Sequence, residues 1–177
     1  FEKYKITAGA KVSFTNTRNG INYDTSDPTL VQDDYFRYKE QIYALYADYS
    51  REFSERFSMQ LGLRMEHTRT TGISEAKDTE DKHDYTRLFP TVYLLYSPTD
   101  GHALNFSFSN RISRPSQNMV NPFPFYQNKY TYACGREDLK PSYTYNAELG
   151  YTLKNNFNVS AYYSYSDDVF FQVVDLD

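Results

Sequence analysis

The sequence contains no tryptophan and a single cysteine, Cys134, among its 177 residues. One cysteine cannot form an internal disulfide, so a small scaffold held together by disulfides is excluded. No stretch approaches 18 consecutive apolar residues, so no transmembrane helix is predicted. The net charge of −4 gives no basic surface for nucleic acid, and no nucleic-acid partner is expected.

Motifs of common enzymes and metal sites are also missing. No Gly-x-Ser-x-Gly elbow and no P-loop occurs. His67, His83 and His102 lie far apart in the sequence, without ligand spacing to Cys134. The acidic run at 75–84 lacks the spacing of an EF-hand. We therefore expect no enzyme activity, no catalytic residue, no cofactor and no metal site.

Tyrosine and phenylalanine, by contrast, are abundant, with 19 and 13 copies. Tyrosine suits strands and membrane–water boundaries because its ring is apolar and its tip is polar. The mean hydropathy of −0.75 does not exclude a lipid-facing sheet. In such a sheet half of each strand is polar and cancels the apolar half.

Apolar and polar residues alternate along most of the chain, as in strands with one apolar and one polar face. The clearest example is the pair of runs at 143–153 and 157–165, which a polar break at 154–156 joins into a hairpin. Each run is about ten residues long, enough to cross a hydrocarbon layer at a tilt. Further strands are predicted at 4–15, 38–53, 57–66, 85–97 and 104–112, and 169–174 is a candidate start of another.

The fourth of these strands, at 85–97, has apolar residues on both faces, so its orientation stays open. Pro90 within it cannot donate to a sheet ladder and predicts a local irregularity. The connections alternate in length, which in a meander places all short turns at one end and all long loops at the other. Outer-membrane barrels have this asymmetry. The long connections are 18–37, 72–84 and 113–142, and the short ones are 54–56, 97–101 and 154–156.

Several motifs between residues 88 and 151 resemble the barrel of TonB-dependent outer-membrane receptors, and in particular the outer membrane protein beta-barrel group of Bacteroidetes. The resemblance covers roughly residues 40 to 165. One departure is Gly135-Arg136-Glu137, where such proteins often carry Gly-Asn-Pro. The motifs are Leu88-Phe89-Pro90, Tyr96-Ser97-Pro98, Ser113-Arg114-Pro115-Ser116, Asn121-Pro122-Phe123, Leu139-Lys140-Pro141 and Asn146-Ala147-Glu148-Leu149-Gly150-Tyr151.

The alternation and the connections predict an all-β, antiparallel up-and-down meander of about seven strands. The resemblance implies that this meander is one segment of a barrel of about 22 strands. Residues 1–177 would form a partial barrel domain with no plug domain and no TonB box. The parent protein would lie in the outer membrane of a Gram-negative cell and import a siderophore, vitamin, glycan or peptide. Its implied partners are outer-membrane lipid, a plug domain, the TonB system and a small nutrient ligand.

An isolated fragment of this kind is expected to self-associate, since it has open edges and an apolar face without lipid. Two alternatives remain open. The first is a stand-alone small barrel or sandwich that binds an apolar ligand, with its apolar faces turned inward. The second is a non-transporting surface barrel that binds glycans. In the favoured interpretation, Tyr43, Tyr143 and Tyr163 lie at the level of the lipid headgroups.

The aromatic connection before the last hairpin holds the candidate substrate contacts, because aromatic rings stack on sugars and other flat faces. The simpler hypothesis is a loop that packs its own rings on the rim of the barrel. Arg111 and Arg114 are likewise either contacts or charges with structural partners. The candidates are Arg114, Phe123, Phe125, Tyr126, Tyr130 and Tyr132.

Overall fold

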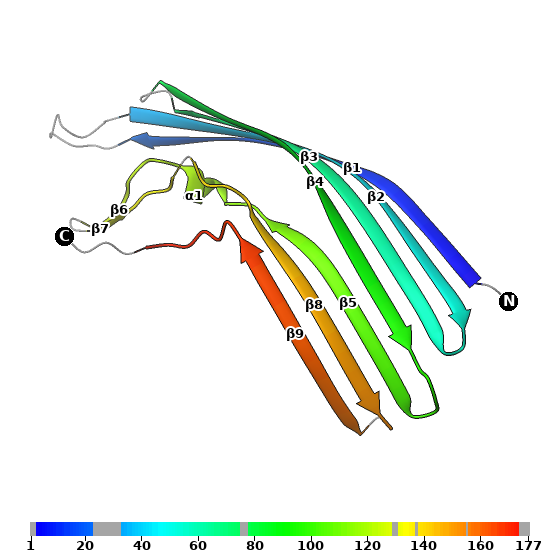
Figure 1. Ribbon diagram of the computed structural model, residues 1–177. Coiled ribbons are helices and arrows are strands. Elements are labelled where there is room, and N and C mark those ends of the chain that lie inside the picture. The colour runs from blue at the N-terminus through cyan, green and yellow to red at the C-terminus, as the bar shows by residue number, and fades with distance from the viewer. Residues whose placement is uncertain are drawn as a thin grey trace.

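The computed structural model describes residues 3–22, 33–74, 78–128, 131–136, 138–154 and 156–173. Seven long strands form one antiparallel sheet in which sequence neighbours pair throughout (Figure 1). The predicted meander is thereby confirmed. In spatial order the strands are β1 (Lys3–Asn22), β2 (Asp33–Ser54), β3 (Phe57–Ser74), β4 (Thr79–Tyr96), β5 (His102–Ser113), β8 (Ser142–Leu153) and β9 (Phe157–Asp167).

The strand register sorts the side chains into two faces, because residues opposite one another point to the same side. Ala10, Leu45, Met65 and Leu88 are neighbours on one face, which we call the apolar face. One residue along, Lys11, Ala44, Glu66 and Arg87 are neighbours on the other, the polar face. Pairing of Leu61 with Val92 and of Met65 with Leu88 settles the orientation of β4.

The apolar face is not a core. Leu45 is 56 % exposed, Leu63 50 % and Leu149 52 %, although each would be buried in a small closed domain. The buried hydrophobic cluster is small and lies elsewhere, around Phe36, Val120 and Phe123. The alternative of a small barrel or sandwich with its apolar faces turned inward is therefore wrong.

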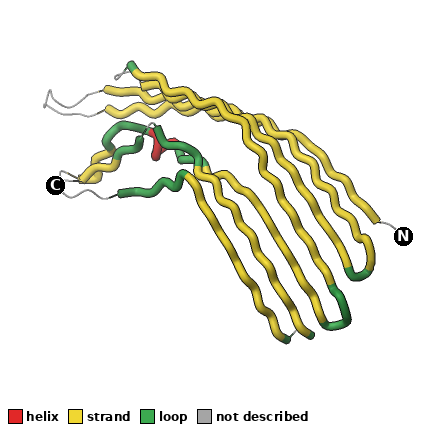
Figure 2. The backbone as a smooth tube through the Cα atoms, in the orientation of Figure 1, coloured by secondary structure: helices red, strands yellow, loops and turns green. Residues whose placement is uncertain are grey.

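The short connections share one end of the sheet, as predicted. Figure 2 shows the turns β2–β3, β4–β5 and β8–β9 together at the lower right. Within the described residues, the helix Gln117–Val120 is far too short to cross a bilayer.

The long loops predicted at 18–37 and 72–84 are shorter than predicted, because the strands on either side continue beyond their apolar stretches. β1 runs to Asn22 and β2 starts at Asp33, while β3 and β4 leave only residues 75–78 between them. Polar cross-strand contacts sustain this extension. Arg69 Nε lies 2.8 Å from Asp84 Oδ2, and His67 Nδ1 lies 3.0 Å from Thr86 Oγ1.

Pro90 marks the point where β4 and β5 separate. β4 pairs with β3 along its whole length, but it pairs with β5 only from Thr91 to Tyr96. Since proline has no N–H to donate, the ladder toward β5 ends next to it. Beyond this point β5 stays with β8, and β1–β4 extend as a separate ribbon (Figure 1). The predicted irregularity at Pro90 is confirmed.

Two smaller predictions are corrected. Residues 169–173 form no strand, because Asp168 adopts a left-handed backbone conformation (φ 52°) that ends β9. Tyr143 is only 8 % exposed and lies beneath the Arg87 guanidinium, 4.9 Å from its ring centre, instead of facing lipid headgroups. Because β5 and β8 separate from β4, the ring of Tyr143 lies under the ribbon of β1–β4. Tyr43 and Tyr163 are exposed, at 39 % and 64 %.

Candidate functional site

The connection from Arg114 to Pro141, here called the inner segment, returns over the polar face of the sheet. Prolines at 115, 122, 124 and 141 keep it from forming a long hairpin. It contains α1 (Gln117–Val120), β6 (Phe125–Asn128) and β7 (Thr131–Ala133), and the last two pair with each other. In Figure 1 it lies between the extended ends of β1–β4 and the end of β9.

Phe123 anchors the inner segment, and its ring is buried against the sheet. It is 7 % exposed and meets Phe36 of β2 edge to face, with ring centres 6.2 Å apart. Val120 belongs to the same cluster, and Tyr38 and Leu139 pack against it. For this residue the simpler hypothesis, a loop that packs its rings on the barrel wall, describes the geometry.

The other aromatic candidates are placed differently. Phe125 is 66 % exposed and Tyr132 is 59 % exposed, both on the β6–β7 hairpin. The side chain of Tyr126 and the whole of Tyr130 lie outside the described residues. Among the aromatic candidates whose side chains the structure describes, Phe125 and Tyr132 are therefore the ones that a ligand can reach.

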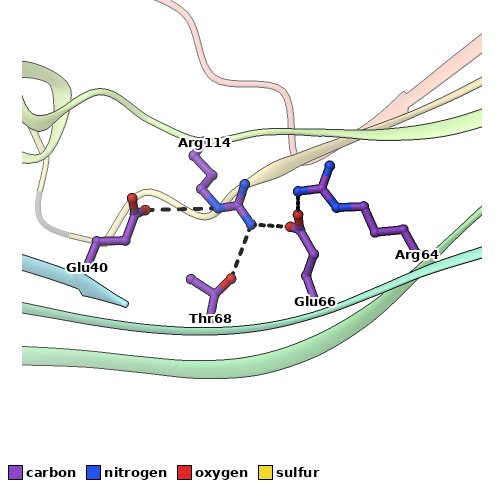
Figure 3. A network of polar contacts seen from close by, with 5 residues as sticks. All are labelled: Glu40, Arg64, Glu66, Thr68 and Arg114. Carbon is purple, nitrogen blue, oxygen red and sulfur yellow. Dashed lines mark hydrogen bonds and ion pairs between the residues drawn. The ribbon is translucent and has the colours of Figure 1, made fainter. Parts of the chain in front are cut away.

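Arg114, the first residue after β5, ties the inner segment to the sheet (Figure 3). Its Nη2 donates to Glu66 Oε2 at 2.6 Å and to Thr68 Oγ1 at 3.1 Å. Its Nε lies 4.0 Å from Glu40 Oε2. Arg64 pairs with the other oxygen of Glu66. Glu66 is 2 % exposed, so its charge is stabilised by two guanidinium groups rather than by water.

Two tyrosines extend this network toward the long-connection end of the sheet. Tyr38 and Tyr85 line the same hollow as Glu40 and Arg114. Burial raises the pKa of both phenols above the usual value.

The sequence indicated that Arg114 is either a contact or a charge with structural partners, and the geometry gives it such partners. It did not single out Glu40, Glu66 or Thr68. The sequence held only a weak signal for Glu66, because Arg64 and Glu66 both lie on the polar side of the strand predicted at 57–66. Only the separation of β5 from β4 brings Arg114 over β3.

Two hollows adjoin the network. The first, between Phe36, Tyr85, Val120 and Pro141, has a volume of about 40 Å³. Such a space holds one or two water molecules and no nutrient. The second is an open hollow on the polar face, where Lys11, Asp48, Arg64 and Arg111 supply charge of both signs. Among the described residues no three His, Cys, Asp or Glu side chains gather as metal ligands.

Gly135 closes the inner segment where two parts of its backbone touch. Its N–H donates to the Asn121 carbonyl at 2.8 Å, and the next N–H, of Arg136, donates to the Met119 carbonyl at 2.7 Å. A Cβ at residue 135 would overlap the Met119 carbonyl and lie 2.7 Å from Asn121 O. Only glycine fits so close to another backbone.

We expect Gly135→Ala to destabilise the inner segment by about 1–3 kcal/mol, because the backbone must move apart and lose these hydrogen bonds. Limited proteolysis of the folded full-length protein should then cut within 114–141 several-fold faster. Cys134→Ala is the matched control, since that side chain is exposed. Equal cleavage of both variants and the wild type would contradict this role of Gly135.

Comparison with known proteins agrees with this geometry. The profile of the Outer membrane protein beta-barrel family matches residues 1–177. No curated protein sequence matches. Two similar solved structures are the ferric citrate transporter FecA in its unliganded form (TM-score 0.59, 14 % identity) and the ferric yersiniabactin uptake receptor FyuA from Yersinia pestis (TM-score 0.58, 16 % identity).

The superposition covers 88 % of this chain and 23 % of FecA, and 94 % of this chain and 26 % of FyuA. The chain thus spans about a quarter of the length of these two proteins. At such low identity the likeness concerns the fold, and the family follows from the profile match over the whole chain. The chain belongs to the outer membrane protein beta-barrel family, and its place is the outer membrane of a Gram-negative cell.

Proposed function

We propose that this chain forms part of the barrel wall of a TonB-dependent transporter that imports a nutrient. The observation that carries the proposal is the sorting of the sheet into an exposed apolar face and a charged polar face, with edges at β1 and β9. A bilayer offers no partner for backbone N–H and C=O groups. Further strands of the parent protein would therefore pair with both edges and close the barrel.

Two features of the polar face support passage of a ligand. The inner segment lies over the polar face at the long-connection end of the sheet. It carries the exposed rings of Phe125 and Tyr132. Charged side chains of both signs line the open hollow below it. FecA and FyuA handle ferric citrate and ferric yersiniabactin, so ferric chelates are the first class to test. Vitamins, glycans and peptides are the other classes.

The test is uptake of labelled ferric chelates, cobalamin, oligosaccharides and peptides by cells with and without the full-length gene. We expect gene-dependent uptake of one class, and its loss when an uncoupler collapses the proton gradient of the inner membrane. Binding without uptake would reject transport and favour the alternative of a surface barrel that binds glycans.

For the class that is taken up, the double variant Phe125→Ala/Tyr132→Ala should raise the half-saturating concentration about tenfold, since each ring contributes about 0.5–1.5 kcal/mol to stacking. Phe157→Ala is the matched control, because this ring is 55 % exposed at the short-turn end. If the double variant has the half-saturating concentration of the wild type, Phe125 and Tyr132 are not part of the ligand site. That result would not contradict transport itself.

A further inference from the structure

One backbone edge of β4 extends beyond the strand that covers it. β4 pairs with β3 over its whole length, from Thr79 to Tyr96, but with β5 only from Thr91 to Tyr96. Within the described residues, the edge turned away from β3 has no strand partner between residues 79 and 89. Further strands of the parent protein would join the sheet at β1 and β9, so closing the barrel leaves this edge uncovered.

Two contacts show which residues direct their backbone groups to this edge. The N–H of Ser97 donates to the Arg56 carbonyl in the β2–β3 turn, 2.7 Å away. On the other side, Asn110 Nδ2 of β5 lies 3.5 Å from the Leu88 carbonyl oxygen. In an antiparallel ladder the N–H and C=O of one residue face the same neighbour, and those of the next residue face the opposite one. Even-numbered residues of β4 therefore face the uncovered edge. Those beyond Leu88, all exposed, are Thr86, Asp84, Lys82 and Glu80.

The charged side chains along this edge compensate one another. Lys82 Nζ lies 2.8 Å from Glu80 Oε2, and Asp84 Oδ2 lies 2.8 Å from Arg69 Nε of β3. Because these charges are paired, the edge has no excess charge to attract an ionic ligand. Each of its exposed residues instead adds one N–H donor and one C=O acceptor. An iron chelate or a sugar has no matching row of groups, whereas an extended peptide has one.

A second copy of the protein does not fit this edge. Two copies in one membrane point the same way, so their β4 strands could pair only in parallel. In the same register, residues 91–96 of the second β4 would occupy the position of β5, which pairs with residues 91–96 of the first. Clearing β5 needs a shift of about six residues, or about 20 Å along the strand. Such a shift would lift a large part of the apolar face of the second copy out of the hydrocarbon layer.

We propose that the edge of β4 from Glu80 to Thr86 binds an extended peptide of about six to eight residues as an added strand. The bound backbone continues the β4–β5 ladder beyond the point where β5 separates. Main-chain hydrogen bonds then give affinity that depends little on the side chains of the peptide. This inference rests on the proposed function, because it selects peptides among the nutrient classes. The long loops of outer-membrane barrels lie outside the cell, so the edge meets a ligand before the lumen does.

The test is binding of a fluorescein-labelled peptide of alternating threonine and valine to the purified full-length protein in detergent, measured by fluorescence anisotropy. Lys82→Pro should weaken binding about tenfold, because the proline ring removes one N–H donor and blocks the strand beside it. Lys82→Gln is the matched control, since it removes the charge, keeps the N–H and should bind like the wild type. The same peptide N-methylated at every residue lacks the donors and should bind the wild type about tenfold more weakly.

A second pair of variants covers the case in which Lys82→Pro does not fold. Thr86→Pro removes another N–H from the same edge, and Thr86→Val removes only the hydroxyl that contacts His67. The proline variant should again bind about tenfold more weakly than its control. Infrared spectra of a peptide labelled with ¹³C at its carbonyls should show the amide I band of the bound peptide at the β-sheet position.

Equal affinity of the proline variants and their controls, equal affinity for the two peptides, or a bound peptide outside the β-sheet band would overturn the proposal. So would loss of protein dimers in Lys82→Pro with unchanged peptide binding, because the edge would then serve pairing between copies. Uptake of a chelate or sugar without peptide binding would reject the edge site and leave transport standing. Peptide binding that is sensitive to Lys82→Pro, without any uptake, would support the edge site and reject transport.

Discussion

Replacing Arg114 by methionine should lower the free energy of unfolding of the full-length protein by about 3 kcal/mol. Arg114 donates to Glu66, which is 2 % exposed, and to Thr68, which is fully buried. Removing one partner of a buried ion pair leaves charge without compensation, which typically costs 3–5 kcal/mol. We expect the lower end of that range because Arg64 still pairs with Glu66. The measurement is reversible urea unfolding in a lipid or detergent environment.

Arg111→Met is the control, because Arg111 lies three residues earlier and is exposed. It should change stability by less than about 0.5 kcal/mol. The double variant Glu66→Met/Arg114→Met should regain most of the loss, since removing both charges avoids the unpaired carboxylate. If Arg114→Met and Arg111→Met prove equally stable, the ion-pair network does not hold the inner segment in place.

Placing an arginine at Leu61 should cost about 2–4 kcal/mol of folding free energy in a bilayer. Leu61 lies midway along the apolar part of β3, with Tyr49 and Val92 as its cross-strand neighbours. Its side chain is 38 % exposed on the face that meets lipid. There an arginine loses its hydration near the middle of the hydrocarbon layer. The readout is urea unfolding of the full-length protein in lipid vesicles.

Gln60→Arg is the control, since Gln60 is the adjacent residue and points to the polar face with Ser50 and Tyr93. It should cost less than about 1 kcal/mol, because the new charge stays in water. The contrast between two consecutive positions tests which face meets lipid. Equal costs at both positions would mean that the two faces are not separated by a membrane.

The local pattern of residues was enough to predict the strands of the last hairpin. At 143–153 and 157–165 one face is apolar and the other polar, so only one register keeps the faces intact. The same reasoning failed for the limits of β1–β4. Beyond their apolar stretches the strands are held by contacts such as Arg69 with Asp84, which involve residues distant in sequence.

The sequence by itself determined the alternation, the turns and the family, because these depend on each residue and its near neighbours. Tertiary structure alone decided the site. Pro90 stops the β4–β5 ladder, the two ribbons separate, and Arg114 crosses to the buried Glu66 on β3. Pro90 predicted an irregularity in β4, but the pairing of Arg114 with Glu66 across 48 residues depends on how far the two ribbons separate, which no local pattern encodes. Likewise Phe123 changed from candidate contact to anchor only once Phe36 was placed against it.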